Sequence, residues 1–250
     1  MMTKGDTLYV GAHADDIFIG AGITISRALE DIHILTVTDS SSSIKYPWTA
    51  GGKEFRSAEE YFAQRRGEET AAMQDLGVSP DRVYMDGEFP DQQTYRHVGE
   101  IVEKIERTIS EKNIERVVTH SFPEAHPDHE IVWFCAHAAG RNKGVGVEEY
   151  VTYRLDRDGK YVKSFLDDNE MSGVRETRLT EEEQSFKDEV SKRYETQQKT
   201  LGIFRTGHEI VGVRKNFSIP THEESRYYYG DRAGCPTPEE IRGAMKGFTE

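Results

Sequence analysis

Cysteine is scarce in this sequence of 250 residues. The two cysteines, Cys135 and Cys235, lie 100 positions apart and form no CxxC pair. Disulfide scaffolds and cysteine-based zinc clusters need several suitably spaced cysteines, so both classes are excluded. So few cysteines suit a reducing compartment, and we expect the protein to be cytoplasmic.

Positive charge is also in short supply. The 32 lysine and arginine residues stand against 45 aspartate and glutamate residues and leave a net charge of −13. Neutralising phosphate groups requires basic patches, so this balance argues against general nucleic-acid binding. It argues equally against binding to an anionic membrane surface.

Long hydrophobic runs are missing as well. The most apolar stretch, residues 131–140, is ten residues long and contains His137. A membrane-spanning helix needs about 20 apolar residues, so we expect no such span. The short apolar run near the N-terminus is interrupted by Asp6, Asp15 and Asp16, so we also expect no signal peptide.

Strand-like and helix-like segments alternate through the first 150 residues. Short runs of β-forming residues predict strands at 7–12, 33–38, 82–85 and 116–120. Apolar periodicity and terminal signals predict helices at 17–29, 57–76, 94–112 and 128–140. This order predicts an α/β, Rossmann-like fold, with a mainly parallel sheet and helices on both of its faces.

Two regions depart from this alternation. Residues 39–53 are rich in serine and glycine, and we expect a loop without structure of its own. After residue 150 we expect a hairpin that turns at Asp158 and Gly159, a polar helix over 181–202 and an irregular stretch over the last 45 residues. We interpret 1–250 as a single domain, with a core at about 5–150 and a C-terminal extension at about 151–250 that completes or covers it.

Polar residues cluster at the C-terminal ends of two of the predicted strands. The clusters are His13-Ala14-Asp15-Asp16 and His126-Pro127-Asp128-His129. Either cluster alone is compatible with the start of a helix, where an aspartate satisfies free N–H groups. Ligands bind outside the carboxyl ends of parallel strands, so the sheet can bring both clusters into one crevice. Imidazole and carboxylate are ligands of catalytic zinc, and together the clusters predict a metal site.

These motifs resemble those of the PIG-L (LmbE-like) family of zinc-dependent N-acetylglucosaminyl de-N-acetylases. That family carries an AHPDDE motif after its first strand and an HPDH motif later in the chain. Here the corresponding residues are 12–17 and 126–129. Weaker matches at 65–68, 89–91 and 194–197 extend the resemblance over about residues 5–200.

The resemblance implies a role for each motif residue. The implied zinc ligands are His13, Asp16 and His129. Asp15 would be the general base, and His126 would polarise the substrate carbonyl and protonate the leaving amine, with Asp128 orienting it. These roles suit amide hydrolysis, which needs activated water, a base for its proton and a donor for the oxyanion.

Arg65 and two replacements bear on the substrate. Arg65 is a candidate substrate-binding residue, since its guanidinium can form a fork with hydroxyl or phosphate groups. The alternative for Arg65 is an i,i+3 pair with Glu68 on the helix surface.

Ala14 stands where the family has proline, and Ile17 stands where it has glutamate. Neither position is a predicted ligand or base, so we expect the chemistry to persist.

The sequence thus predicts a zinc-dependent hydrolase that removes an N-acyl group, acetyl by resemblance, from an amino sugar or its conjugate. Two alternatives stay open: a non-catalytic relative that binds a glycan or nucleotide-sugar, and an amidase for a non-sugar thiol conjugate. The presence of both Asp15 and His126 favours an enzyme, because binding alone requires neither a base nor a proton donor. The resemblance also suggests a homo-oligomer, although no sequence feature shows an interface.

Overall fold

The computed structural model describes residues 5–28, 31–42, 49–50, 53–156, 158–166, 168–217 and 235–249. Within these ranges, seven strands form one sheet in the order β10-β11-β7-β6-β1-β2-β5. The strands are β1 (Asp6–Gly11), β2 (Ile32–Ser42), β5 (Val83–Asp91), β6 (Ile114–His120), β7 (Gly146–Tyr150), β10 (Met171–Arg178) and β11 (His208–Arg214). The run from β7 to β5 is parallel, and β11 and β10 extend it by antiparallel pairing beyond β7.

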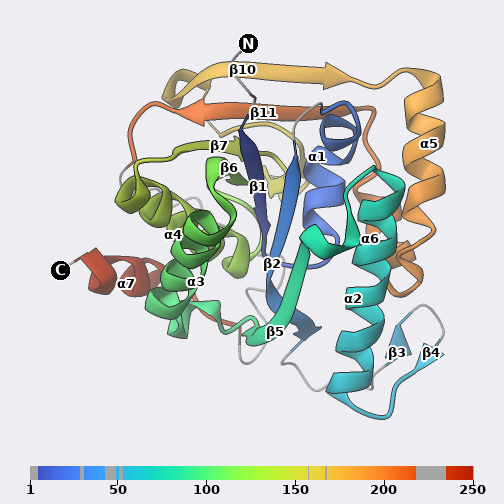
Figure 1. Ribbon diagram of the computed structural model, residues 1–250, viewed down its shortest axis with the longest axis horizontal. Helices are drawn as coiled ribbons and strands as arrows, with labels where there is room; N and C mark the ends of the chain where they lie inside the picture. The colour runs from blue at the N-terminus through green and yellow to red at the C-terminus, as the bar shows by residue number, and fades with distance from the viewer. Residues whose placement is uncertain are drawn as a thin grey trace.

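Helices cover both faces of this sheet, which confirms the predicted α/β fold (Figure 1). They are α1 (Asp16–Ser26), α2 (Ala58–Asp75), α3 (Val98–Lys112), α4 (Pro127–Lys143), α5 (Glu181–Ser191), α6 (Gln198–Ile203) and α7 (Pro238–Thr249). Successive residues of β1 serve opposite faces, as a pleated strand requires. Leu8 and Val10 pack with α3, α4 and α7, whereas Tyr9 packs with α1, α2 and α5.

Local sequence accounts for the ends and faces of these helices. Ser57 caps α2 by accepting the backbone N–H of Glu60. Helix α3 buries Ile101 and Ile105 on one face and ends at Asn113, which takes the left-handed conformation with φ of 52°. Among the helices that the structure describes, none is both long enough and apolar enough to cross a membrane.

The C-terminal half supports the helix that follows the first motif. Helix α1 has a kink at Ala21, where φ is −144°. The kink frees the backbone N–H groups of Ile23 and Thr24, and the Glu209 carboxylate of β11 accepts both at 2.8 Å. Lys187 of α5 in turn donates to Glu209 at 2.5 Å. An extension strand therefore caps the second half of α1.

The predicted loop over residues 39–53 is only partly correct. Strand β2 continues to Ser42, because β5 runs to Asp91 and pairs with it there. Two further short strands, β3 (Thr49–Ala50) and β4 (Lys53–Glu54), pair in antiparallel fashion. The remainder of the predicted loop, 43–48 and 51–52, lies outside the described residues.

The C-terminal predictions also need correction. The turn at Gly159 is confirmed, but its hairpin is short, formed by β8 (Arg154–Leu155) and β9 (Tyr161–Val162). The helix predicted over 181–202 is two helices, α5 and α6, because Thr196 leaves the helical path to bond with Glu68 of α2. Strand β10 was missed. The last 45 residues, predicted to be irregular, contain β11 and α7, and 218–234 lie outside the described residues.

Candidate metal centre

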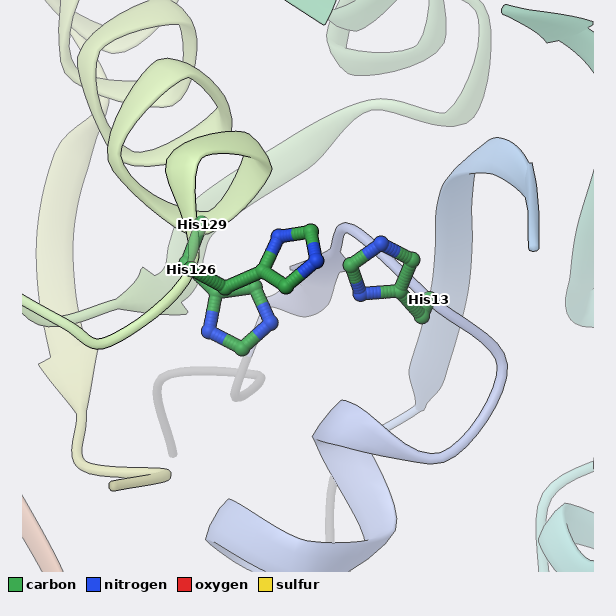
Figure 2. Close-up of side chains that lie close together, drawn as sticks. All are labelled: His13, His126 and His129. Atoms are coloured by element: carbon green, nitrogen blue, oxygen red, sulfur yellow. The ribbon is translucent and has the colours of Figure 1, made fainter. Parts of the chain in front are cut away.

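The two polar clusters meet at the carboxyl ends of the neighbouring parallel strands β1 and β6. His13 lies in the turn between β1 and α1, and Asp16 is the first residue of α1. His126 caps the N-terminus of α4, and His129 lies in its first turn. Figure 2 shows the three imidazole rings gathered in the space between the two turns. All four side chains are buried, so their charges are little screened by water.

Asp16 is the central residue of this group. Its Oδ2 lies 3.1 Å from Nδ1 of His13 and 3.2 Å from Nε2 of His129. The same oxygen accepts the backbone N–H of His13 at 2.7 Å, so the carboxylate also fixes the turn. Ligand atoms on a tetrahedral zinc, with bonds of about 2.0 Å, stand about 3.3 Å apart. Both spacings around Asp16 are close to that value.

The contact between His129 and Asp16 is favourable only if a proton or a metal ion lies between the two side chains. Nδ1 of His129 donates to Oε2 of Glu124 at 2.7 Å, so the other nitrogen of the neutral ring carries a lone pair. That nitrogen, Nε2, faces the Asp16 carboxylate and has no hydrogen-bond partner among the described residues. Two lone pairs at this distance repel each other unless a proton or a metal ion lies between them.

The pKa values of His129, His13 and Asp16 also show that this site favours positive charge on the histidines. Burial opposes protonation of His129, but the carboxylates of Asp16 and Glu124 outweigh it and raise the pKa of His129 to about 9. Burial is likewise outweighed at His13, where Asp91 and Asp16 raise the pKa well above its usual value. Although burial disfavours the Asp16 carboxylate, the two histidines hold its pKa well below the usual range.

Within the part of the chain that the structure describes, three groups of buried side chains each bring one ligand atom per residue within 4.8 Å of the others. They are His13–His126–His129, Asp16–His120–His129 and His13–Asp91–His126–Asp128. The predicted set of His13, Asp16 and His129 is not itself one of these groups, although Asp16 contacts both histidines. The three groups consist of imidazoles and carboxylates, which are ligands that Zn²⁺ takes in proteins, so the residues of this site fit the metal. The ligand set itself stays a prediction.

The backbone holds His126 in one tautomer. Its Nδ1 accepts the N–H of Asp128 at 3.2 Å, so the ring proton lies on Nε2. Burial and the adjacent His13 lower the pKa of His126 well below its usual value. The Asp128 carboxylate lies 3.9 Å from Nδ1 of His126 but 3.3 Å from Nε2 of His13. It also accepts the Gln92 N–H at 2.6 Å and the Thr94 hydroxyl at 2.5 Å, so it is firmly fixed.

Asp15 lies beside the centre and is held by Arg65. Nη2 of Arg65 donates to Oδ1 of Asp15 at 2.9 Å, and Nη1 lies 3.4 Å from Oε2 of Glu68. Thr196 secures Glu68 by donating its N–H at 3.0 Å and its hydroxyl at 2.6 Å. The contact between Arg65 and Glu68 is therefore present, but it is buried, with Arg65 only 1% exposed. Substrate binding by Arg65 stays a prediction.

The two departures from the family motif have structural explanations. The backbone N–H of Ala14 donates to Oγ of Ser40 at 3.0 Å, a bond that proline cannot form. The loop is therefore fixed by a hydrogen bond where the family uses a ring. The side chain of Ile17 is fully buried in the apolar cluster against α1 and β1, where a glutamate would be costly to bury.

Sequence reasoning missed three residues of the site. Glu124 and His120 are fully buried beneath the centre, and Oε2 of Glu124 accepts from Nδ1 of both His120 and His129. Oδ1 of Asp91 lies 3.3 Å from Nε2 of His13. The sequence did contain signals for two of them: Glu124 lies two residues before the second motif, and His120 lies at the end of a predicted strand. Phe89-Pro90-Asp91 had been matched to the family only as a loop.

The comparison with protein families adds an independent observation. The PIG-L family model, described as GlcNAc-PI de-N-acetylase, matches residues 8–139, which is more than half of the 250 residues and includes both motifs. The chain belongs to the PIG-L family. A comparison with curated protein sequences finds no match.

Solved structures share the fold at low sequence identity. The zinc-inhibited form of teicoplanin deacetylase Orf2 has a TM-score of 0.66 at 19% identity, over 85% of this chain and 100% of that chain. The N,N'-diacetylchitobiose deacetylase from Pyrococcus horikoshii has a TM-score of 0.53 at 16% identity, over 82% of this chain and 83% of its own. GalB, the 4-carboxy-2-hydroxymuconate hydratase from Pseudomonas putida KT2440, has a TM-score of 0.52 at 16% identity, over 87% of this chain and 98% of its own. Deacetylases and a hydratase share this fold, so the fold alone does not define the reaction.

Proposed function

We propose that the protein is a metal-dependent N-deacetylase that releases acetate from an N-acetylated amino sugar or amino-sugar conjugate, with Zn²⁺ as the metal. The observation that carries the proposal is the Asp16 carboxylate between His13 and His129, with oxygen-to-nitrogen distances of 3.1 and 3.2 Å. Membership of the PIG-L family supports the choice of reaction and of substrate class.

His13, Asp16 and His129 would hold the metal. Bound there, the metal would act as a Lewis acid that polarises the amide carbonyl and makes a water molecule more acidic. Asp15 lies next to these ligands in sequence, and its carboxylate is fixed by Arg65. Asp15 accepts a proton from the attacking water, whose oxygen forms the new bond to the carbonyl carbon.

His126 is the candidate hydrogen-bond donor to the substrate carbonyl oxygen. Its Nε2 carries the ring proton, because Nδ1 accepts the Asp128 N–H. Nε2–H can therefore donate a hydrogen bond to the oxygen that gains negative charge as water adds. The C–N bond then breaks, the amine leaves with the proton that Asp15 took from the attacking water, and acetate remains to be released. Asp128 and Asp91 both contact Nε2 of His13 and so orient its ring.

Asp91 is also suited to contact the substrate. Burial, reinforced by the neighbouring Asp128, raises the pKa of Asp91, and its Oδ1 lies 3.3 Å from Nε2 of His13. A carboxyl oxygen has two lone pairs, so this oxygen can also accept a hydrogen bond from a sugar hydroxyl. We propose Asp91 as the first candidate for sugar recognition.

Acetate release from a panel of N-acetylated amino sugars tests the proposal. The metal-replete protein should release acetate, whereas the protein stripped by a chelator should not, and zinc should restore the activity. A thiol-conjugated amide in the same panel covers the non-sugar alternative. Metal binding without turnover of any panel member would favour the binding-protein alternative.

A further inference from the structure

One buried carboxylate beneath the metal centre has no role in the chemistry described above. Glu124 lies between β6 and α4 and is 1% exposed. Its Oε2 accepts from Nδ1 of His129 at 2.7 Å and from Nδ1 of His120 at 3.0 Å. Its Oε1 accepts from the Thr152 N–H at 2.7 Å and from the Ser121 hydroxyl at 3.0 Å. All four donors face acceptor sites that only an ionised carboxylate supplies.

We propose that Glu124 is a positioning residue for the metal centre, which fixes both the tautomer and the orientation of His129. Because Glu124 accepts a hydrogen bond from Nδ1–H, the ring proton of His129 stays on Nδ1 and the lone pair lies on Nε2, where it faces Asp16. A histidine ligand held by a carboxylate in this way binds metal more tightly.

The same carboxylate also connects the two motifs. His120, the second ring bound to Glu124, accepts the backbone N–H of Ala12 through Nε2 at 3.0 Å. Ala12 immediately precedes His13, so Glu124 reaches the first motif through one ring and the second motif through the other. Thr152, after β7, holds the opposite oxygen in place. Glu124 therefore ties together the ends of three neighbouring strands around the metal centre.

The substitution Glu124→Gln tests the inference, because it keeps the shape of the side chain and removes its charge. If the new amide nitrogen faces the histidines, two N–H groups meet and the His129 proton is displaced to Nε2, where it blocks the metal. If the amide oxygen faces them instead, the amide nitrogen meets the N–H of Thr152. In either arrangement one donor lacks an acceptor. We expect zinc affinity, measured by competition with a chelator, to fall about 10–100-fold.

Glu149→Gln is the matched control. Glu149 is also fully buried and accepts from a histidine, Nε2 of His137, at 2.9 Å, but its other partners are Trp133 and Arg214. We expect this variant to lose stability and to keep the zinc affinity of the wild type. Equal zinc affinities of Glu124→Gln and Glu149→Gln would overturn the inference.

A second measurement needs no variant. In ¹⁵N NMR spectra of the zinc-loaded wild type, we expect the proton of His129 on Nδ1 and the metal on Nε2. A proton on Nε2, or metal on Nδ1, would overturn the positioning role even if the variant failed to fold. The inference rests on the proposed metal centre, and the two fail differently. A wild type that binds no zinc refutes the metal centre, whereas one that binds zinc with the other tautomer refutes only the role of Glu124.

Discussion

The guanidinium of Arg65 donates a hydrogen bond of 2.9 Å to the carboxylate of Asp15, and both side chains are buried. The contact joins α2 to the turn that carries the first motif, across 50 positions of sequence. Glu68 and Thr196 hold the other side of the guanidinium, so the extension reaches the proposed base through this chain of contacts. Because the planar guanidinium is also held at Glu68 and Thr196, its one hydrogen bond to Asp15 sets the direction of that carboxylate more strictly than a lysine ammonium would.

Arg65→Lys should therefore reduce turnover more than it weakens substrate binding. Lysine keeps the positive charge but loses the fork, so the Asp15 carboxylate is free to turn away from the attacking water. We expect kcat to fall about 10²-fold, as for other small misplacements of a reacting group, with KM nearly unchanged. Steady-state kinetics on the best substrate of the panel supply both values. A rise in KM with unchanged kcat would instead make Arg65 a substrate-binding residue, as the sequence suggested.

Asp15 and Asp16 are adjacent, yet their contacts predict different effects of the same substitution. Asp16→Asn removes the charge shared by His13 and His129, so zinc affinity should fall strongly. Asp15→Asn keeps the volume of the side chain but cannot accept a proton at neutral pH. It should retain zinc and lose turnover by about 10²–10⁴-fold, the range for a positioned acid or base.

Zinc content and steady-state kinetics of the two variants against the wild type supply the test. If Asp15→Asn loses zinc and Asp16→Asn keeps it, Asp15 is the metal ligand and Asp16 is the base. Full activity of Asp15→Asn on the true substrate would refute the proposed mechanism. Ser40→Ala serves as a control for the shape of the turn, because it removes only the hydrogen bond to the Ala14 N–H.

The residues of the site that could be predicted are those that belong to the two short sequence motifs. His13 follows β1 and His129 opens the helix after β6, and parallel strands place their carboxyl ends along one edge of the sheet. The contacts of Asp91 with His13 and of Arg65 with Asp15 depend instead on which loops and helices meet over that edge. These are contacts between distant segments, and no local pattern in a single sequence specifies them.

The fold shows the same division. Helix α3 was predicted because Ile101, Ile105 and Ile109 repeat on one face, and all three are buried. Strand β10 carries mostly exposed residues and gains its structure from pairing with β11, so it lacks a period-2 signal. The break between α5 and α6 arises at Thr196, whose partner Glu68 lies 128 positions earlier. Helical propensity alone could not locate that break.

Glu69 should make the stability of the protein depend on pH. The side chain is fully buried on α2, accepts the Thr36 hydroxyl at 2.5 Å, and has no hydrogen-bond partner for Oε2 among the described residues. Burial raises the pKa of Glu69 from 4.5 to about 8. The folded state then binds more protons than the unfolded state between these values, so Glu69 makes the free energy of unfolding decrease as pH rises from about 4.5 to about 8.

Glu69→Gln should remove this contribution, because glutamine resembles the protonated carboxyl at every pH. Urea unfolding of the metal-free wild type and variant at pH 6 and pH 9 measures the difference. We expect the variant to gain stability relative to the wild type by several kcal/mol between these two pH values. Glu103→Gln, at an exposed position of α3, should show no such change. A pH-independent difference between Glu69→Gln and the wild type would contradict the buried, protonated state.

Arg214 and Glu149 should account for much of the attachment of β11 to the parallel part of the sheet. Arg214 donates to both carboxylate oxygens of Glu149, at 2.7 and 2.9 Å, and its guanidinium lies 5.4 Å from the ring centre of Trp133. Arg214→Met leaves the Glu149 charge buried without its guanidinium partner, so it should lower the free energy of unfolding by about 3–5 kcal/mol. The double variant Arg214→Met/Glu149→Leu has no unpaired buried charge and should recover part of that loss, although His137 and Trp133 lose their acceptor. Urea unfolding of Arg214→Met and of the double variant tests this prediction. If the two residues contribute only through packing, the double variant should be less stable than Arg214→Met.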